Sequence, residues 1–132
     1  IGLNISGSGN ITTASLDTDR LDVAVFGSGE ARIDSLTTEK VEVRIIGSGE
    51  VRLAGEVAGQ DIDISGSGEY RGGDLRAETV EITISGSGDS TVWATESLDV
   101  RINGSGSLDY YGSPTVDRSG SGSGELNDLG EK

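Results

Sequence analysis

The stretch VRIIGSGEVRL, residues Val43 to Leu53, sets alternating apolar residues on both sides of a Gly-Ser-Gly triplet. The same triplet recurs along the chain, beginning at Gly7, Gly27, Gly47, Gly66, Gly86 and Gly104, with a doubled copy from Ser119. The successive spacings are 20, 20, 19, 20 and 18 residues. A repeat of about 20 residues is typical of a solenoid, in which each unit packs only on its neighbours.

Each unit contains short stretches in which every second residue is apolar. Before the triplets these stretches are Leu21-Val23-Val25, Val41-Val43-Ile45, Ile62-Ile64, Val80-Ile82-Ile84 and Leu98-Val100-Ile102. After the triplets come the shorter pairs Ala31/Ile33, Val51/Leu53 and Leu108/Tyr110, and then a lone apolar position filled by Leu16, Leu36 or Leu75. A period of two indicates β-strands with one buried face. We therefore expect two or three short inward-facing strands in each unit.

A single unit of this length cannot close a hydrophobic core, but stacked units place identical apolar columns about 4.8 Å apart. The sequence therefore predicts an all-β fold, a right-handed parallel β-helix of about six coils and roughly 30 Å in length. Residues 1–132 are expected to form one solenoid domain, with 119–132 a loosely repeating C-terminal end. No sustained helical spacing of apolar residues is present.

The triplets are predicted to form the corners of the coils. A corner repeated in register requires positive φ and close approach of neighbouring backbones, which glycine allows at the least steric cost. A Walker loop would continue into Gly-Lys-Ser/Thr, and a dinucleotide-binding loop would lead into a helix. The nonapeptides of a calcium β-roll repeat about twice as often as these units. The corner interpretation is the one that accounts for six copies.

Composition excludes several classes of partner. The net charge is −13 and the pI is about 4.1, which argues against nucleic acid and anionic lipid, since both are bound through clustered Lys and Arg. No apolar run is long enough for a membrane span. The chain has no Cys, which excludes disulfides and thiolate metal sites, and no cofactor is expected.

The repeated segments also resemble a known family. The segments VAVFGSGEARI, VRIIGSGEVRL, IDISGSGEYR, ITISGSGDSTV and VRINGSGSLDY each show a hydrophobic strand, then GSG, then, in four of the five, an acid. This pattern resembles the head GIN domain family of auto-transporter adhesins, and it covers nearly the whole chain. The resemblance implies a β-helical domain on an exported or envelope-anchored protein, with no active site to carry over.

Two rows of acidic residues are predicted on the outer surface. One row stands five residues before each triplet and comprises Asp22, Glu42, Asp61, Glu81 and Asp99. Like charges about 4.8 Å apart repel by about 0.9 kcal/mol even in bulk water, so this row should splay, pair or recruit cations. Arg44 and Arg101 are the nearby cations. The row is either a solvated face that keeps the protein soluble or a weak Ca²⁺ or Mg²⁺ site formed by carboxylate oxygens.

The second acidic row follows the triplets and comprises Glu30, Glu50, Glu69 and Asp89. Three arginines, Arg32, Arg52 and Arg71, stand two residues beyond the first three of these acids and are expected on the same strand face. This spacing predicts an exposed lattice of ion pairs of small net stabilisation.

The few aromatic residues suggest a ligand face. In the repeat frame Trp93 and Tyr111 share one outward column on successive coils, where they either hold a sugar ring or pack locally under a loop. Tyr70 and Tyr110 take inward positions. Phe26 and Ile46 are predicted to form a small exposed apolar strip beside the triplets.

Catalysis has little support in the sequence. The chain has neither His nor Cys, so the usual general base and the Ser–His and Cys–His nucleophile pairs are absent. The acids fall in regular columns instead of a distinct pocket that would shift their pKa values. The sequence therefore predicts a non-enzymatic protein.

The two ends of the rod motivate two functional hypotheses. Leu3 and Ile5 point inward at one end and Val116 and Leu126 at the other, and no amphipathic capping helix is visible. In the first hypothesis these ends pair, so that copies of the chain assemble end to end into a fibre or surface scaffold. In the second, the chain is a monomeric adhesin-type module that binds a glycan or protein on one face. Either role places it outside the cell or in the cell envelope.

Overall fold

The computed structural model describes residues 2–119 and 124–130, and the described residues contain strands but no helix. They form one 11-stranded parallel sheet. Its strands are β1 (Gly2–Gly7), β2 (Asn10–Thr13), β3 (Leu16–Asp17), β4 (Arg20–Gly27), β5 (Glu30–Gly47), β6 (Glu50–Gly66), β7 (Glu69–Gly86), β8 (Asp89–Gly104), β9 (Ser107–Tyr111), β10 (Thr115–Ser119) and β11 (Glu125–Asp128). Most of the doubled triplet after Ser119 lies outside the described residues.

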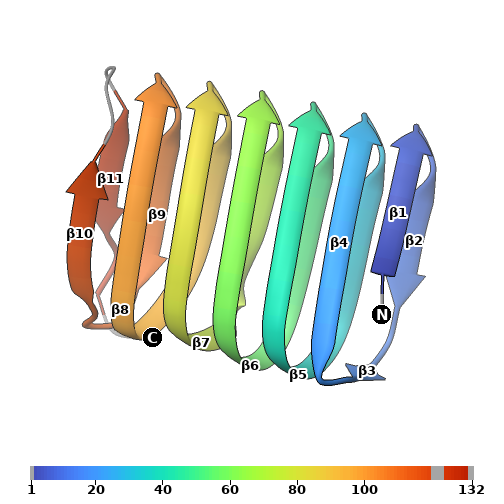
Figure 1. Cartoon of the computed structure of the whole chain (residues 1–132), viewed down its shortest axis with the longest axis horizontal. Helices are drawn as coiled ribbons and strands as arrows, with labels where there is room; N and C mark the ends of the chain where they lie inside the picture. Colours follow the sequence, from blue (N-terminus) through green and yellow to red (C-terminus); the bar gives the residue numbers. More distant parts are fainter. Residues whose placement is uncertain (1, 120–123, 131–132) are drawn as a thin grey trace.

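The sheet winds into a flattened, right-handed solenoid of about six coils, as predicted (Figure 1). One face, here called the front face, carries β1, β4, β10 and the C-terminal parts of β5–β8. The rear face carries β2, β9, β11 and the N-terminal parts of β5–β8. Each of β5–β8 runs down the rear, bends at the bottom and rises along the front, so a single strand assignment spans both faces.

Pairing on the front face is in register from coil to coil. Val23 pairs with Val43, and Val43 pairs with Ile62, so each apolar column continues into the next coil. Among the described strands, register shifts occur only after the triplets, for example between Ile33 and Leu36 of β5. The unequal repeat lengths are therefore absorbed on the rear face and at the bottom bend.

The core is the space between the two faces. Its front columns contain residues such as Leu21 and Val25, which are both 0% exposed, and its rear columns contain residues such as Ile33 and Leu36. β-branched and leucine side chains fill it, which explains how a chain with 4% aromatic residues closes a core.

The triplets form the corners, as predicted. The first glycine of each triplet has positive φ, and at Gly47 the value is 111°. A Cβ atom at Gly47 would lie 2.7 Å from the Gly27 carbonyl oxygen of the preceding coil. The backbone N–H of Ser48 donates to that same oxygen at 3.0 Å. Stacked corners are thus held by main-chain hydrogen bonds that leave no room for a side chain.

One tyrosine interrupts the aliphatic core. Tyr70 is fully buried, and its hydroxyl donates to Gln60 Oε1 at 2.6 Å across the coil. Space for the ring comes from Gly72, where a Cβ atom would lie 2.7 Å from ring atoms of Tyr70, and from Ser90, its partner in the next coil. Among the described side chains, the Gln60 Nε2 and Ser90 Oγ atoms are buried without a hydrogen-bond partner.

Candidate functional site

The front face carries the first predicted acidic row as a continuous column. Asp22, Glu42, Asp61, Glu81 and Asp99 pair successively in register, and the column continues to Asp117 of β10. We call these six residues the acidic column. Its sixth member was missed although the signal was present, because Asp117 also stands five residues before a triplet, the second copy in the doubled stretch, which begins at Gly122.

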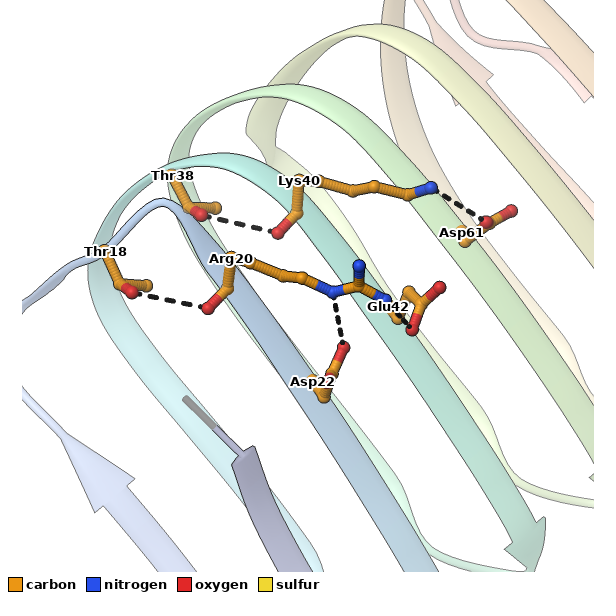
Figure 2. A network of polar contacts seen from close by, with 7 residues as sticks. All are labelled: Thr18, Arg20, Asp22, Thr38, Lys40, Glu42 and Asp61. Atoms are coloured by element: carbon orange, nitrogen blue, oxygen red, sulfur yellow. Dashed lines mark hydrogen bonds and ion pairs between the residues drawn. The ribbon is translucent and has the colours of Figure 1, made fainter.

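The cations that pair with the acidic column differ from those predicted. Arg20 donates to Glu42 at 2.9 Å and lies 3.5 Å from Asp22, while Lys40 Nζ lies 3.7 Å from Asp61 Oδ2 (Figure 2). Arg44 and Arg101 lie two residues after the acids and make none of the ion pairs found among the described residues. The signal was present, because Arg20 and Lys40 stand two residues before an acid and therefore share its strand face.

The backbone at Arg20 and at Lys40 accepts the same local hydrogen bond beside the bottom bend. The Thr18 hydroxyl donates to the Arg20 carbonyl oxygen at 3.3 Å, and the Thr38 hydroxyl donates to the Lys40 carbonyl oxygen at the same distance (Figure 2). The two cations are therefore held on equivalent backbone just after the bottom bend. Hydrogen bonds and charge from Glu42, and then from Asp22, raise the pKa of Arg20.

Among the described residues, the cations that pair with the acidic column and compensate its negative charge are found only beside its N-terminal half. In the column that contains Arg20 and Lys40, the next positions are Gly59, Thr79 and Ser97. The effect appears at Glu81, where a hydrogen bond with Asp61 and repulsion from Asp61 and Asp99 raise the pKa of the carboxyl group, against a smaller opposing effect of Lys40. The C-terminal half of the column is thus less well compensated than the N-terminal half.

This imbalance predicts that Glu81→Gln raises the melting temperature by a few degrees at neutral pH. The raised pKa means that the charged Glu81 destabilises the folded state above that pKa, and that acidification through it towards 4.5 relieves the repulsion in the wild type. The wild type should therefore gain stability relative to Glu81→Gln over that pH range. Thermal unfolding monitored by circular dichroism tests this, with the exposed Glu78→Gln as the control. Equal pH profiles for wild type and Glu81→Gln would refute it.

Cation binding to this column stays a prediction. Among residues 2–119 and 124–130, no group of three or more acidic side chains is arranged to hold a metal ion. Added NaCl should stabilise the protein by screening the column. A larger shift with CaCl₂ at matched ionic strength would indicate specific binding, and equal shifts would reject it.

Only part of the second acidic row forms the predicted lattice of ion pairs with arginines. Glu30, Glu50, Glu69 and Asp89 do pair in register on the rear face. Arg71 bridges two of them, with its Nε 2.8 Å from Glu69 and 3.2 Å from Glu50. The prediction was wrong for Arg32, which pairs at 2.9 Å with Asp34, because that carboxylate lies two residues further along the same face.

A groove of about 500 Å³ lies on the front face beside the acidic column. It is lined by Asn4, Asp22, Val23, Ala24, Phe26, Glu42, Val43, Arg44, Asp61, Ile62, Asp63 and Thr83. We call it the Phe26 groove. The predicted apolar strip is confirmed, since Phe26 and Ile46 are paired in register and are 40% and 43% exposed. The groove arises because the small Ala24 lies between two longer outward residues of its strand, Asp22 and Phe26.

The predicted aromatic pair, Trp93 and Tyr111, lies outside the Phe26 groove. Trp93 and Tyr111 are register partners on β8 and β9, and both side chains are partly buried. Glycines pack close to them: a Cβ atom at Gly73 would lie 3.3 Å from the Tyr111 ring, and one at Gly112 would lie 3.4 Å from Trp93. The shared column is confirmed, and the close glycines fit the local packing that was the alternative to a sugar site.

The end residues occupy the predicted columns. Ile5 is 4% exposed, and Leu3, Val116 and Leu126 are partly buried against the core. One unexpected residue stands at the C-terminal end, where Arg118 pairs with Val100 and so falls in an otherwise apolar inward column. Its side chain is exposed and donates to the Gly124 carbonyl oxygen. A charge in an inward column disfavours further stacking at this end.

Comparison with known proteins places this solenoid in a family. A family model described as "Putative auto-transporter adhesin, head GIN domain" matches residues 2–114. The chain belongs to the head GIN domain family. No curated protein matches it. No helix in the described part of the chain is long and apolar enough to cross a membrane.

Several solved structures are similar to this protein over nearly the whole chain. A "putative lipid binding protein" from Parabacteroides distasonis is 32% identical, with a TM-score of 0.96, over 98% of this chain and 53% of its own. A "putative adhesin" from Bacteroides fragilis is 36% identical, with a TM-score of 0.86, over 97% and 60%. A "putative adhesin" from Parabacteroides merdae is 27% identical, with a TM-score of 0.93, over 96% and 53%. The chain thus spans little more than half the length of these proteins.

Proposed function

We propose that the chain is a non-enzymatic adhesin-type module of the cell surface or envelope, which binds a surface partner on its front face. The observation that carries this proposal is the Phe26 groove, a hollow of about 500 Å³ on the front face in which the exposed ring of Phe26 lies beside the acidic column. That volume falls within the range of about 300–1,000 Å³ typical of ligand sites. The family and the names of the similar structures support the adhesin type.

A lipid-binding role, suggested by the name of one similar structure, fits this chain less well. An acyl chain requires an apolar channel or a broad apolar patch. The interior between the two faces is occupied by buried side chains, and the large exposed apolar residues of the described chain are Phe26, Ile46 and Leu129. The net charge of −13 also opposes an anionic lipid surface.

End-to-end assembly is a second candidate, favoured by the strand edge at β1. Among the residues that the structure describes, β1 pairs on one side only, with β4, and Leu3 and Ile5 face the interior behind that edge. Such an edge can accept a strand from another copy. The opposite end is less suitable for this pairing, because stacking over Arg118 would bury a charge beneath an apolar column.

Sedimentation and cell binding together separate the two candidates. The adhesin-type module is expected to sediment as a compact species of 13.5 kDa and to bind cells saturably in a screen of labelled protein against bacterial and epithelial cells. Concentration-dependent elongated particles that disappear in Leu3→Asp and Ile5→Pro would instead favour assembly. A monomer that binds none of the screened cells would refute the adhesin-type proposal, and a monomer at high concentration in low and high salt would refute assembly.

A further inference from the structure

The two halves of the front face differ in charge. Four carboxylates line the Phe26 groove, and three cations, Arg44 in the groove and Arg20 and Lys40 beside it, leave it with one net negative charge. A second hollow further along the rod, of about 460 Å³, is lined by Asp61, Glu81, Asp99 and Asp117, with Arg101 as the one cation among its described lining residues. A cationic partner would be drawn to the second hollow, because the acids there are less compensated.

We infer that the Phe26 groove binds an uncharged sugar ring of a surface polysaccharide. This inference rests on the proposed function and gives it a ligand class. The groove combines two surfaces that a sugar requires. Phe26, 40% exposed, offers a flat apolar face to the C–H face of the ring. The opposite wall of carboxylates, Asp22, Glu42 and Asp61, accepts hydrogen bonds from the ring hydroxyls.

The ion pairs make this wall suitable for a neutral ligand. Arg20 bridges Asp22 and Glu42, and Lys40 lies beside Asp61, so the carboxylates are held in position and their charge is largely compensated (Figure 2). Each carboxylate has two oxygens and about four lone-pair positions, so an ion pair leaves acceptors for a hydroxyl group. Hydrogen bonds to a charged acceptor are stronger than neutral ones.

The floor of the groove supplies complementary donors and the space for a ring. Asn4, Ala24, Arg44 and Asp63 follow one another in a single outward column, in register across four coils. The amide of Asn4 and the guanidinium of Arg44 offer hydrogen-bond donors to a ligand, and the carboxylate of Asp63 offers acceptors. Ala24, between Asn4 and Arg44, provides the hollow below the ring. Apolar and polar groups therefore surround the same volume, as in sites for small ligands.

The test uses a printed array of neutral, anionic and cationic oligosaccharides, followed by titration calorimetry of the strongest neutral binder. Ala24→Arg fills the floor of the groove without touching the core, and should abolish binding. Phe26→Ala removes the apolar wall and should weaken binding about tenfold. Ala58→Arg introduces the same side chain at an exposed position outside the groove and should leave binding unchanged. Trp93→Ala should also leave it unchanged. Circular dichroism verifies that each variant is folded.

Several outcomes would overturn the inference. These are a wild-type protein that binds no neutral glycan on the array, an Ala24→Arg variant that binds as well as wild type, and a loss of binding in Trp93→Ala. Cells that bind wild type and Ala24→Arg equally, before and after periodate oxidation of their glycans, would overturn the sugar ligand and leave the adhesin-type function standing. The absence of any cell binding would overturn the function itself.

Discussion

Replacing Gly47 by Val is expected to destabilise the protein by about 4 kcal/mol. Two costs add. A β-branched residue at a φ of 111° carries a backbone strain of about 1–3 kcal/mol. Its Cβ atom would also lie 2.7 Å from the Gly27 carbonyl oxygen, which is main chain and cannot rotate away, and such overpacking costs about 1–3 kcal/mol. Urea unfolding followed by circular dichroism measures the loss.

The first coil provides a control that separates these two costs. Gly7 has the same role and a φ of 84°, but a Cβ atom there would meet nothing within 4 Å. Gly7→Val should therefore show the backbone strain alone, about 1–3 kcal/mol. Equal losses at Gly7 and Gly47 would mean that close stacking of the corners contributes nothing.

The second large effect is expected at the buried tyrosine. Tyr70→Phe should cost about 1–3 kcal/mol, because it leaves the whole amide group of Gln60 buried without a partner. Burial raises the pKa of Tyr70 above 10, so the folded state retains its proton after the unfolded state has lost it. The wild type should therefore lose stability as the pH rises above 10, and Tyr70→Phe should lose less.

A double variant tests whether the hydrogen bond is the cause. Tyr70→Phe combined with Gln60→Leu removes both polar groups and retains a similar volume, so it should recover most of the lost stability. The wild type, Tyr70→Phe, Gln60→Leu and the double variant form a double-mutant cycle, in which denaturant unfolding measures the free energy of unfolding of each. If the two single losses simply add, the hydrogen bond between Tyr70 and Gln60 is not what stabilises this layer.

The sequence predicts much of this fold because each coil repeats the same physical requirements. The alternation in Val41-Val43-Ile45 and its copies sets the strand, the inward face and the register at once. The position of Asp22 in one coil therefore predicts that of Glu42 in the next. Corners could be predicted for the same reason, since glycine recurs where positive φ is needed.

The parts that the sequence did not predict are those in which the repeats differ. Arg20 and Lys40 have no counterpart in later coils, so a consensus of the repeats hides them. Arg118 stands where every other coil has an apolar residue, and its place follows only from its pairing with Val100. The Phe26 groove depends on one small residue, Ala24, beside one large residue, and on the height of neighbouring side chains, which a periodic pattern does not encode.

The register shifts on the rear face and at the bottom bend show where this protein can accept insertions and deletions. Units of 18 to 20 residues coexist because additions and losses are absorbed there, for example between Gly72 and Arg76. The front columns keep their alignment whatever the length of the unit. A short peptide inserted at the bend should therefore be displayed at the side of the rod without shifting any front-face residue. The solenoid can acquire new loops along this one edge while the residues of its front face keep the same register and spacing.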